Sequence, residues 1–169
     1  MIHLYVGNGR GKTTAVTGLA LRLLENKERV LLVSFLKNDK SGEIQWLKKN
    51  SPIKIICQNN LKKFVKDMTP TEYEVTKTAQ LKLLGEALND CALYDVIILD
   101  EFTDIIDLGM IETAEAIDIV KRIAKKAELI ITGHYLVEDL VELSDYYTEF
   151  ISHKHPYTKG IKARKGIEY

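Results

Sequence analysis

The chain has 169 residues, of which 46% are hydrophobic, and its 24 basic side chains are balanced by 24 acidic ones. This length and composition fit one compact core, so we expect residues 1–169 to form a single domain. The zero net charge excludes the broad positive field that recruits nucleic acid or anionic membranes, and we expect neither as a partner. No apolar run reaches the roughly 20 residues of a membrane span, and the first residues lack the apolar region of a signal peptide. The sequence therefore predicts a cytoplasmic protein.

Short apolar, β-branched runs alternate with segments of helical period along the chain. The predicted strands are residues 2–6, 29–36, 53–57, 94–100, 128–132 and 146–152. The predicted helices are residues 13–26, 61–67, 69–91, 111–127 and 136–145, and Thr69, Pro70 and Glu72 form a capping-box pattern at the start of the third. Strands that are apolar on both faces and alternate with helices indicate a mostly parallel sheet covered on both sides. We therefore expect a three-layer α/β domain.

A glycine-rich loop follows the first predicted strand directly. It comprises Gly7, Asn8, Gly9, Arg10, Gly11, Lys12, Thr13 and Thr14. A strand, a glycine loop and a helix start direct several backbone N–H groups and the positive helix end at one point, which suits phosphate oxygens. Lys12 adds a full charge, and Thr13 stands where a hydroxyl ligates Mg²⁺. Because the strict spacing would place its first glycine at Val6, we interpret this loop as a variant phosphate-binding loop (P-loop) rather than a turn that merely joins strand and helix.

Two acids, Asp100 and Glu101, follow the apolar residues of the fourth predicted strand. P-loop proteins use an acid at this place to hold Mg²⁺, directly or through water, and a following acid can ligate the metal or orient water. We therefore predict Thr13, Asp100 and Glu101 as the magnesium site, with Lys12 and Glu101 as catalytic residues. The alternative is that the two acids only begin a helix, as its N-cap and first-turn carboxylate. The spacing does not decide which acid touches the metal.

Three further side chains lie after predicted strands or near them, and each has two interpretations. Ligands of parallel sheets bind beyond the carboxyl ends of the strands, where Lys37 and His134 are expected. Lys37 either reaches a substrate or lies solvated in its loop. His134 either takes a polar role in the site or is an ordinary loop histidine. Phe64 belongs either to a docked surface helix or to a pocket.

The last segment, "HKHPYTKGIKARKGIEY", is rich in basic residues and contains two glycines. Gly160 and Gly166 indicate tight backbone turns, which would bring Lys162, Arg164 or Lys165 near anionic or amide-bearing groups of a ligand. A solvated basic tail is the plainer interpretation. Basic residues with an aromatic also permit nucleic-acid contact, but the neutral chain argues against a large phosphate footprint.

The segments "GNGRGKTT", "FLK", "VIILDE", "IITG" and "HPYTKGIKARKGIEY" together resemble the ATP:corrinoid adenosyltransferases of cobalamin biosynthesis and salvage. The resemblance spans nearly the whole chain, and its last segment is the most specific part. It implies a sheet order like that of recombination-type ATPases and a homodimer. It also implies the reaction: the cobalt(I) of a reduced corrinoid, cob(I)alamin or cob(I)yrinic acid a,c-diamide, attacks the 5′ carbon of ATP, and inorganic triphosphate leaves.

This resemblance assigns roles to the residues. The loop would hold a leaving group, with Mg²⁺ as cofactor and ATP as co-substrate, and an electron donor such as a reduced flavin or flavodoxin would supply the reduced corrinoid. Residues that would contact the corrinoid or support its site are Lys37, Phe64, His134, Lys162 and Arg164. Family members commonly carry a Phe/Trp pair after the third strand, where this chain has only Phe64.

Two other functions use the same motifs. A kinase or ATPase on this loop would release ADP and would need a residue that activates a hydroxyl or water. A nucleotide-gated binding module would bind ATP without turnover and use its basic tail to contact a partner.

Overall fold

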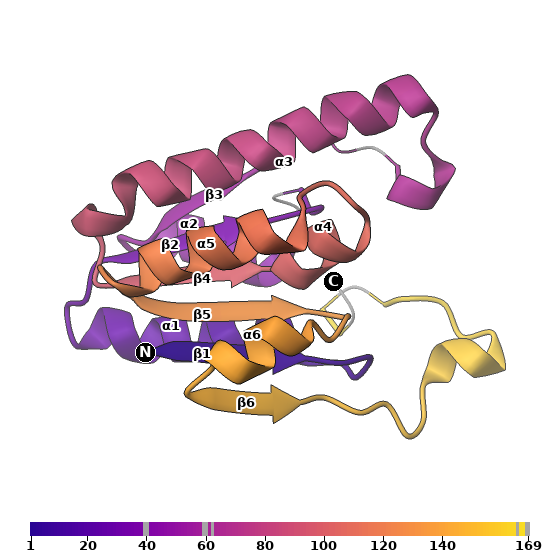
Figure 1. The fold of residues 1–169 in the computed structure, drawn as a ribbon. Helices are drawn as coiled ribbons and strands as arrows, with labels where there is room; N and C mark the ends of the chain where they lie inside the picture. The colour runs from indigo at the N-terminus through magenta and orange to yellow at the C-terminus, as the bar shows by residue number, and fades with distance from the viewer. Residues whose placement is uncertain (39–40, 59–60, 62, 165, 168–169) are drawn as a thin grey trace.

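A computed structural model describes residues 1–38, 41–58, 61, 63–164 and 166–167. Within these ranges the strands form one sheet in the order β3-β2-β4-β5-β1-β6, and every neighbouring pair is parallel. The strands are β1 (Ile2–Val6), β2 (Val30–Ser34), β3 (Lys54–Cys57), β4 (Val96–Asp100), β5 (Glu128–Gly133) and β6 (Tyr146–Glu149). β5 lies between β1, which precedes the glycine loop, and β4, which ends in the acids. All three therefore deliver their following segments to the same edge of the sheet (Figure 1).

Helices cover both faces of the sheet. They are α1 (Lys12–Glu25), α2 (Gly42–Asn50), α3 (Pro70–Asp90), α4 (Phe102–Asp107), α5 (Thr113–Ala124) and α6 (Glu138–Leu143). Alternate residues of β4 face opposite cores: Ile98 packs with α1 and α2, whereas Ile97 and Leu99 pack with the other four helices. The predicted three-layer α/β architecture is confirmed. No helix in the described part of the chain combines the length and apolar character that crossing a membrane requires.

The start of α3 follows the sequence prediction. The Thr69 side chain accepts the N–H of Glu72, and the Glu72 carboxylate accepts the N–H of Thr69, which completes the capping box. Pro70 occupies the first helical position, where its missing N–H costs nothing.

The segment before α3 differs from the prediction. In place of a helix over residues 61–67, the described residues contain only a short 3-10 turn, η1 (Val65–Asp67). Phe64 is extended and 77% exposed, whereas Val65 is partly buried against the core. Two short helices, α2 and α4, were not predicted. α2 buries only Ile44 and Leu47, which is too few apolar positions to give a clear helical period.

Candidate functional site

The glycine loop lies against the backbone that follows β6. The N–H of Gly9 donates to the carbonyl of Phe150 at 2.7 Å, and a Cβ added at Gly7 or Gly9 would collide with the Phe150 backbone. Gly7 and Gly11 also have positive φ angles of 118° and 101°. Gly11 is the N-cap of α1, and no side chain caps the helix there. The first N–H groups of α1 are therefore available to an anion.

Lys12 folds back into the loop. Its Nζ donates to the carbonyls of Gly7 at 2.6 Å and Gly9 at 3.0 Å, and the residue is only 5% exposed. Burial lowers the pKa of this ammonium. The charge thus lies inside the loop that the sequence assigns to phosphate.

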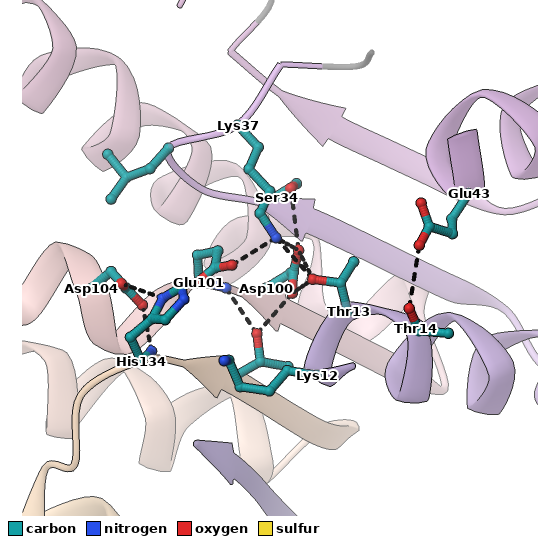
Figure 2. Close-up of polar contacts among 12 residues, drawn as sticks. Lys12, Thr13, Thr14, Ser34, Lys37, Glu43, Asp100, Glu101, Asp104 and His134 are labelled. Atoms are coloured by element: carbon teal, nitrogen blue, oxygen red, sulfur yellow. Dashed lines mark hydrogen bonds and ion pairs between the residues drawn. The ribbon is translucent and has the colours of Figure 1, made fainter. Parts of the chain in front are cut away.

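The three predicted magnesium ligands converge on one cation, the ammonium of Lys37 (Figure 2). Its Nζ donates to Thr13 Oγ1 at 2.8 Å and to Asp100 Oδ2 at 3.0 Å, and it lies 2.7 Å from Glu101 Oε1. Burial disfavours the charged form, but the attraction of Asp100 and Glu101 outweighs it and raises the pKa of Lys37 above its usual value. A hydroxyl and two carboxylates around a bound cation are a donor set that fits Mg²⁺.

Asp100 and Glu101 are held by contacts other than helix capping. Thr132 Oγ1 donates to Asp100 Oδ1 at 2.7 Å and accepts the N–H of Glu101 at 3.0 Å. Glu101 is the residue that precedes α4, but its side chain makes no cap hydrogen bond. Burial opposes ionisation, but the hydrogen bond from His134 and the charge of Lys37 hold the pKa of Glu101 well below its usual range. A helix does begin after the two acids, as the alternative expected, but the Glu101 side chain contacts Lys37 and His134 rather than capping it.

His134 joins Glu101 to a third acid, Asp104. Its Nδ1 is 2.9 Å from Asp104 Oδ1 and 3.0 Å from Glu101 Oε2, and its backbone N–H donates to Asp104 Oδ2. The hydrogen bonds to these carboxylates raise the pKa of His134 to about 9, so it is protonated at neutral pH. A Cβ at Gly133 would collide with the Thr103 and Asp104 side chains, so glycine permits this close approach. Sequence reasoning missed Asp104, although it lies only four residues after Asp100.

Two cavities meet at Glu101 and His134. One, of about 340 Å³, follows the glycine loop from Asn8 to Thr14 and also touches His155 and Ile167. The other, of about 590 Å³, contains Lys37 and Asp104 and has an otherwise mostly apolar lining. Its apolar side chains are Leu36, Leu61, Phe64, Val65 and Leu108. The loop cavity thus opens beside a larger cavity that combines these apolar side chains with charged ones, Lys63 and Lys66 among them.

The tail reaches the loop by residues other than those predicted. Arg10 Nη2 donates to the carbonyl of Ile167 at 2.7 Å, and His155 lines the loop cavity. Lys162 and Arg164 are exposed and line neither cavity, so their contact with a ligand stays a prediction, and Lys165 lies outside the described residues. Phe64 does line the larger cavity, which favours its pocket interpretation.

A parallel sheet with a glycine loop before one helix, and with acids at the end of a nearby strand, defines a P-loop nucleotide-binding α/β protein. The family model described as ATP:corrinoid adenosyltransferase BtuR/CobO/CobP matches residues 1–169, and the chain belongs to this family of alkyl-group transferases. The family resemblance seen in the motifs is thereby confirmed.

Individual relatives agree with the family match. The corrinoid adenosyltransferase of Escherichia coli and the corrinoid adenosyltransferase CobA of Salmonella typhimurium are each 28% identical over 170 residues. These alignments cover 100% of this chain and 85% of each relative. An uncharacterized protein of Nostoc sp., all2391, is also 28% identical, over 92% of this chain but only 44% of its own length.

Proposed function

We propose that this protein transfers the 5′-deoxyadenosyl group of ATP to the cobalt of a reduced corrinoid and releases inorganic triphosphate. The observation that carries this proposal is the junction of the two cavities at Glu101 and His134. A triphosphate in the glycine loop and a corrinoid in the apolar cavity would meet there. Cobalt must reach the 5′ carbon of ATP while this carbon is still bonded to the triphosphate. We therefore place the 5′ carbon at this junction.

The loop side would stabilise the leaving group. Lys12 and the open N–H groups at the start of α1 are suited to the charge that develops on the triphosphate as the carbon–oxygen bond breaks. Thr13, Asp100 and Glu101 would hold Mg²⁺, which would neutralise further charge on the triphosphate when bound. Cobalt(I) is itself a strong nucleophile, so the protein's tasks are positioning and charge stabilisation rather than activation of a side chain.

The other cavity would take the corrinoid, either cob(I)alamin or cob(I)yrinic acid a,c-diamide. Leu36, Val65 and Leu108 give it an apolar wall of the kind a flat macrocycle packs against, and Phe64 adds an aromatic ring. Family membership supports three further parts of the proposal. These are a reduced flavin or flavodoxin as electron donor, a homodimer, and a cytoplasmic location.

Product analysis tests the proposal. The protein is incubated without oxygen with ATP, Mg²⁺ and a chemically reduced corrinoid, and the products are separated. We expect adenosylated corrinoid and triphosphate in equal amounts, and neither product when the corrinoid is omitted. Release of ADP would contradict the proposal and identify a kinase or ATPase, and ATP binding without any product would identify a binding module.

A further inference from the structure

We propose that the ammonium of Lys37 occupies the divalent-cation site of the free protein and excludes Mg²⁺ from it until a nucleoside triphosphate binds. This inference rests on the proposed function, because the cation concerned is the one that accompanies the nucleotide. It makes Lys37 a positioning residue that decides the order in which metal and nucleotide enter.

The contacts of Lys37 carry the inference. Its Nζ lies within 3.0 Å of an oxygen of Thr13, Asp100 and Glu101, the same three residues that the motifs assign to Mg²⁺. Asp100 is fully buried, and the Lys37 side chain is 32% exposed. In Figure 2 the ammonium lies between Thr13 on the start of α1 and the two acids at the end of β4. A metal ion and this ammonium cannot hold these oxygens together.

The backbone directs Lys37 to this position. Leu36, directly before it, has a left-handed φ of 52°, which is costly for a residue with a side chain. The N–H of Leu36 donates at 3.0 Å to Gln80 Oε1, and Gln80 is fully buried in α3. Glu101 is also left-handed, with a φ of 61°. The backbone that carries Lys37 and the backbone of Glu101 are thus held in constrained turns, which places the two side chains within reach of each other.

Charge explains why metal and nucleotide should enter together. Lys37 already offsets part of the charge of Asp100 and Glu101, and free Mg²⁺ would have to displace an ammonium that both carboxylates hold. A bound triphosphate favours the exchange in two ways. Its oxygens provide new partners for the displaced ammonium, and they provide additional ligands for the metal. Mg²⁺ sites of nucleotides are commonly completed by phosphate oxygens in this way. Since Lys37 also lines the larger cavity, its side chain has room to withdraw.

The test measures Mn²⁺ binding, by electron paramagnetic resonance of the free ion, to the wild type and to Lys37→Met without nucleotide. We expect Lys37→Met to bind one Mn²⁺ with a Kd lower than that of the wild type by about tenfold or more, because a unit positive charge has been removed from the site. Lys121→Met, which removes an exposed lysine of α5, is the matched control and should bind as the wild type does. The melting temperature of each variant establishes that it is folded.

Two additional arms locate the metal and separate the inference from the proposed function. In Lys37→Met/Glu101→Gln the gained Mn²⁺ binding should be lost, which ties it to this site. Two results without nucleotide would overturn the inference. The wild type and Lys37→Met could bind Mn²⁺ with the same Kd, or neither could bind it. With ATP present, the wild type should bind Mn²⁺. If the wild type bound no Mn²⁺ with ATP present, that result would count against the proposed magnesium–ATP site. The comparison without nucleotide would still decide the role of Lys37.

Discussion

Lys12 places a positive charge inside the glycine loop, and its removal is the most direct test of that loop. We expect Lys12→Ala to lower the rate of adenosylation by about 100-fold or more, because an oriented charge at a developing anion contributes this much in enclosed sites. The rate is measured with saturating ATP and reduced corrinoid. Lys121→Ala, an exposed lysine on α5, is the control. Equal rates in Lys12→Ala and the wild type would remove the loop from the reaction.

Asp100 and Glu101 should set the dependence on Mg²⁺. We expect Asp100→Asn and Glu101→Gln each to raise the Mg²⁺ concentration at half-maximal rate by roughly tenfold or more, because each removes a charged oxygen from the donor set. A titration of the rate against Mg²⁺ at fixed ATP measures this change. Asp107→Asn, at the exposed end of α4, should leave the titration unaltered. If both site variants titrate like the wild type, the acids do not hold the metal.

His134 should make stability depend on pH in the alkaline range. Its pKa is raised from 6.5 to about 9 by hydrogen bonds to Asp104 and Glu101, so folding favours the protonated ring. The resulting stabilisation is fully present below 6.5 and is lost as the pH rises through about 9. We therefore expect the free energy of unfolding to fall more steeply over this window in the wild type than in His134→Gln.

Urea unfolding at a series of pH values measures the pH effect of His134. His153→Gln, which replaces an exposed histidine of the tail, is the control and should follow the wild type. Parallel curves for the wild type and His134→Gln would show that the ion pairs around His134 do not stabilise the fold.

Part of this site was predictable from local sequence, and part was not. The loop, Asp100 and Glu101 are recognisable because strand, loop and helix are adjacent along the chain. For Lys37 and His134 the sequence left two interpretations, since a loop side chain is oriented by residues far away, such as Gln80 and Asp104. Asp104 was missed because α4 is too short to show a period, and only its helical turn brings this acid beside Glu101.

At the scale of elements, the capping box at the start of α3 is the feature with the clearest energetic consequence. Thr69→Ala removes the side-chain acceptor for the N–H of Glu72, and we expect it to lower the free energy of unfolding by about 1 kcal/mol. Chemical denaturation measures the change. Thr71→Ala, an exposed position one residue into the same helix turn, is the control. If Thr69→Ala and Thr71→Ala lowered the free energy of unfolding equally, the cap would not contribute to stability.

Strands were easier to predict than short helices in this protein. β2 and β4 are buried along their whole length, and their continuous apolar runs mark them within a few residues. α2 buries only two apolar residues, so no period appears in its sequence, whereas the segment before α3 was predicted as a helix and forms only the short turn η1. β6 ends at Glu149, three residues before its predicted end, because the Phe150 backbone then turns to bond the glycine loop. The residues around Phe150 do not by themselves indicate a contact with a loop so far away along the chain.

At the scale of the whole molecule, the sheet order brings segments from distant parts of the chain to one edge. The chain after β6 extends past the carboxyl ends of the strands (Figure 1) and returns to the loop, where Ile167 accepts from Arg10. The cavity at this edge is lined by residues 8–14, Glu101 and His134 together with two residues of the tail. The tail is a component of the loop cavity in the described residues, through His155 and Ile167.

The tail should accordingly matter more for activity than for stability. Among the described residues of the segment from Gly160 to Tyr169, Ile161 and Ile167 are exposed, so we expect its deletion to leave the melting temperature within a few degrees of that of the wild type. The same deletion removes one wall of the loop cavity and the partner of Arg10, so adenosylation at saturating substrates should fall by about tenfold or more. Arg10→Ala, which removes the hydrogen bond to Ile167 but keeps the tail, should have a smaller effect. A folded truncation with normal turnover would exclude the tail from the site, whereas a parallel loss of stability and activity would make it a structural segment.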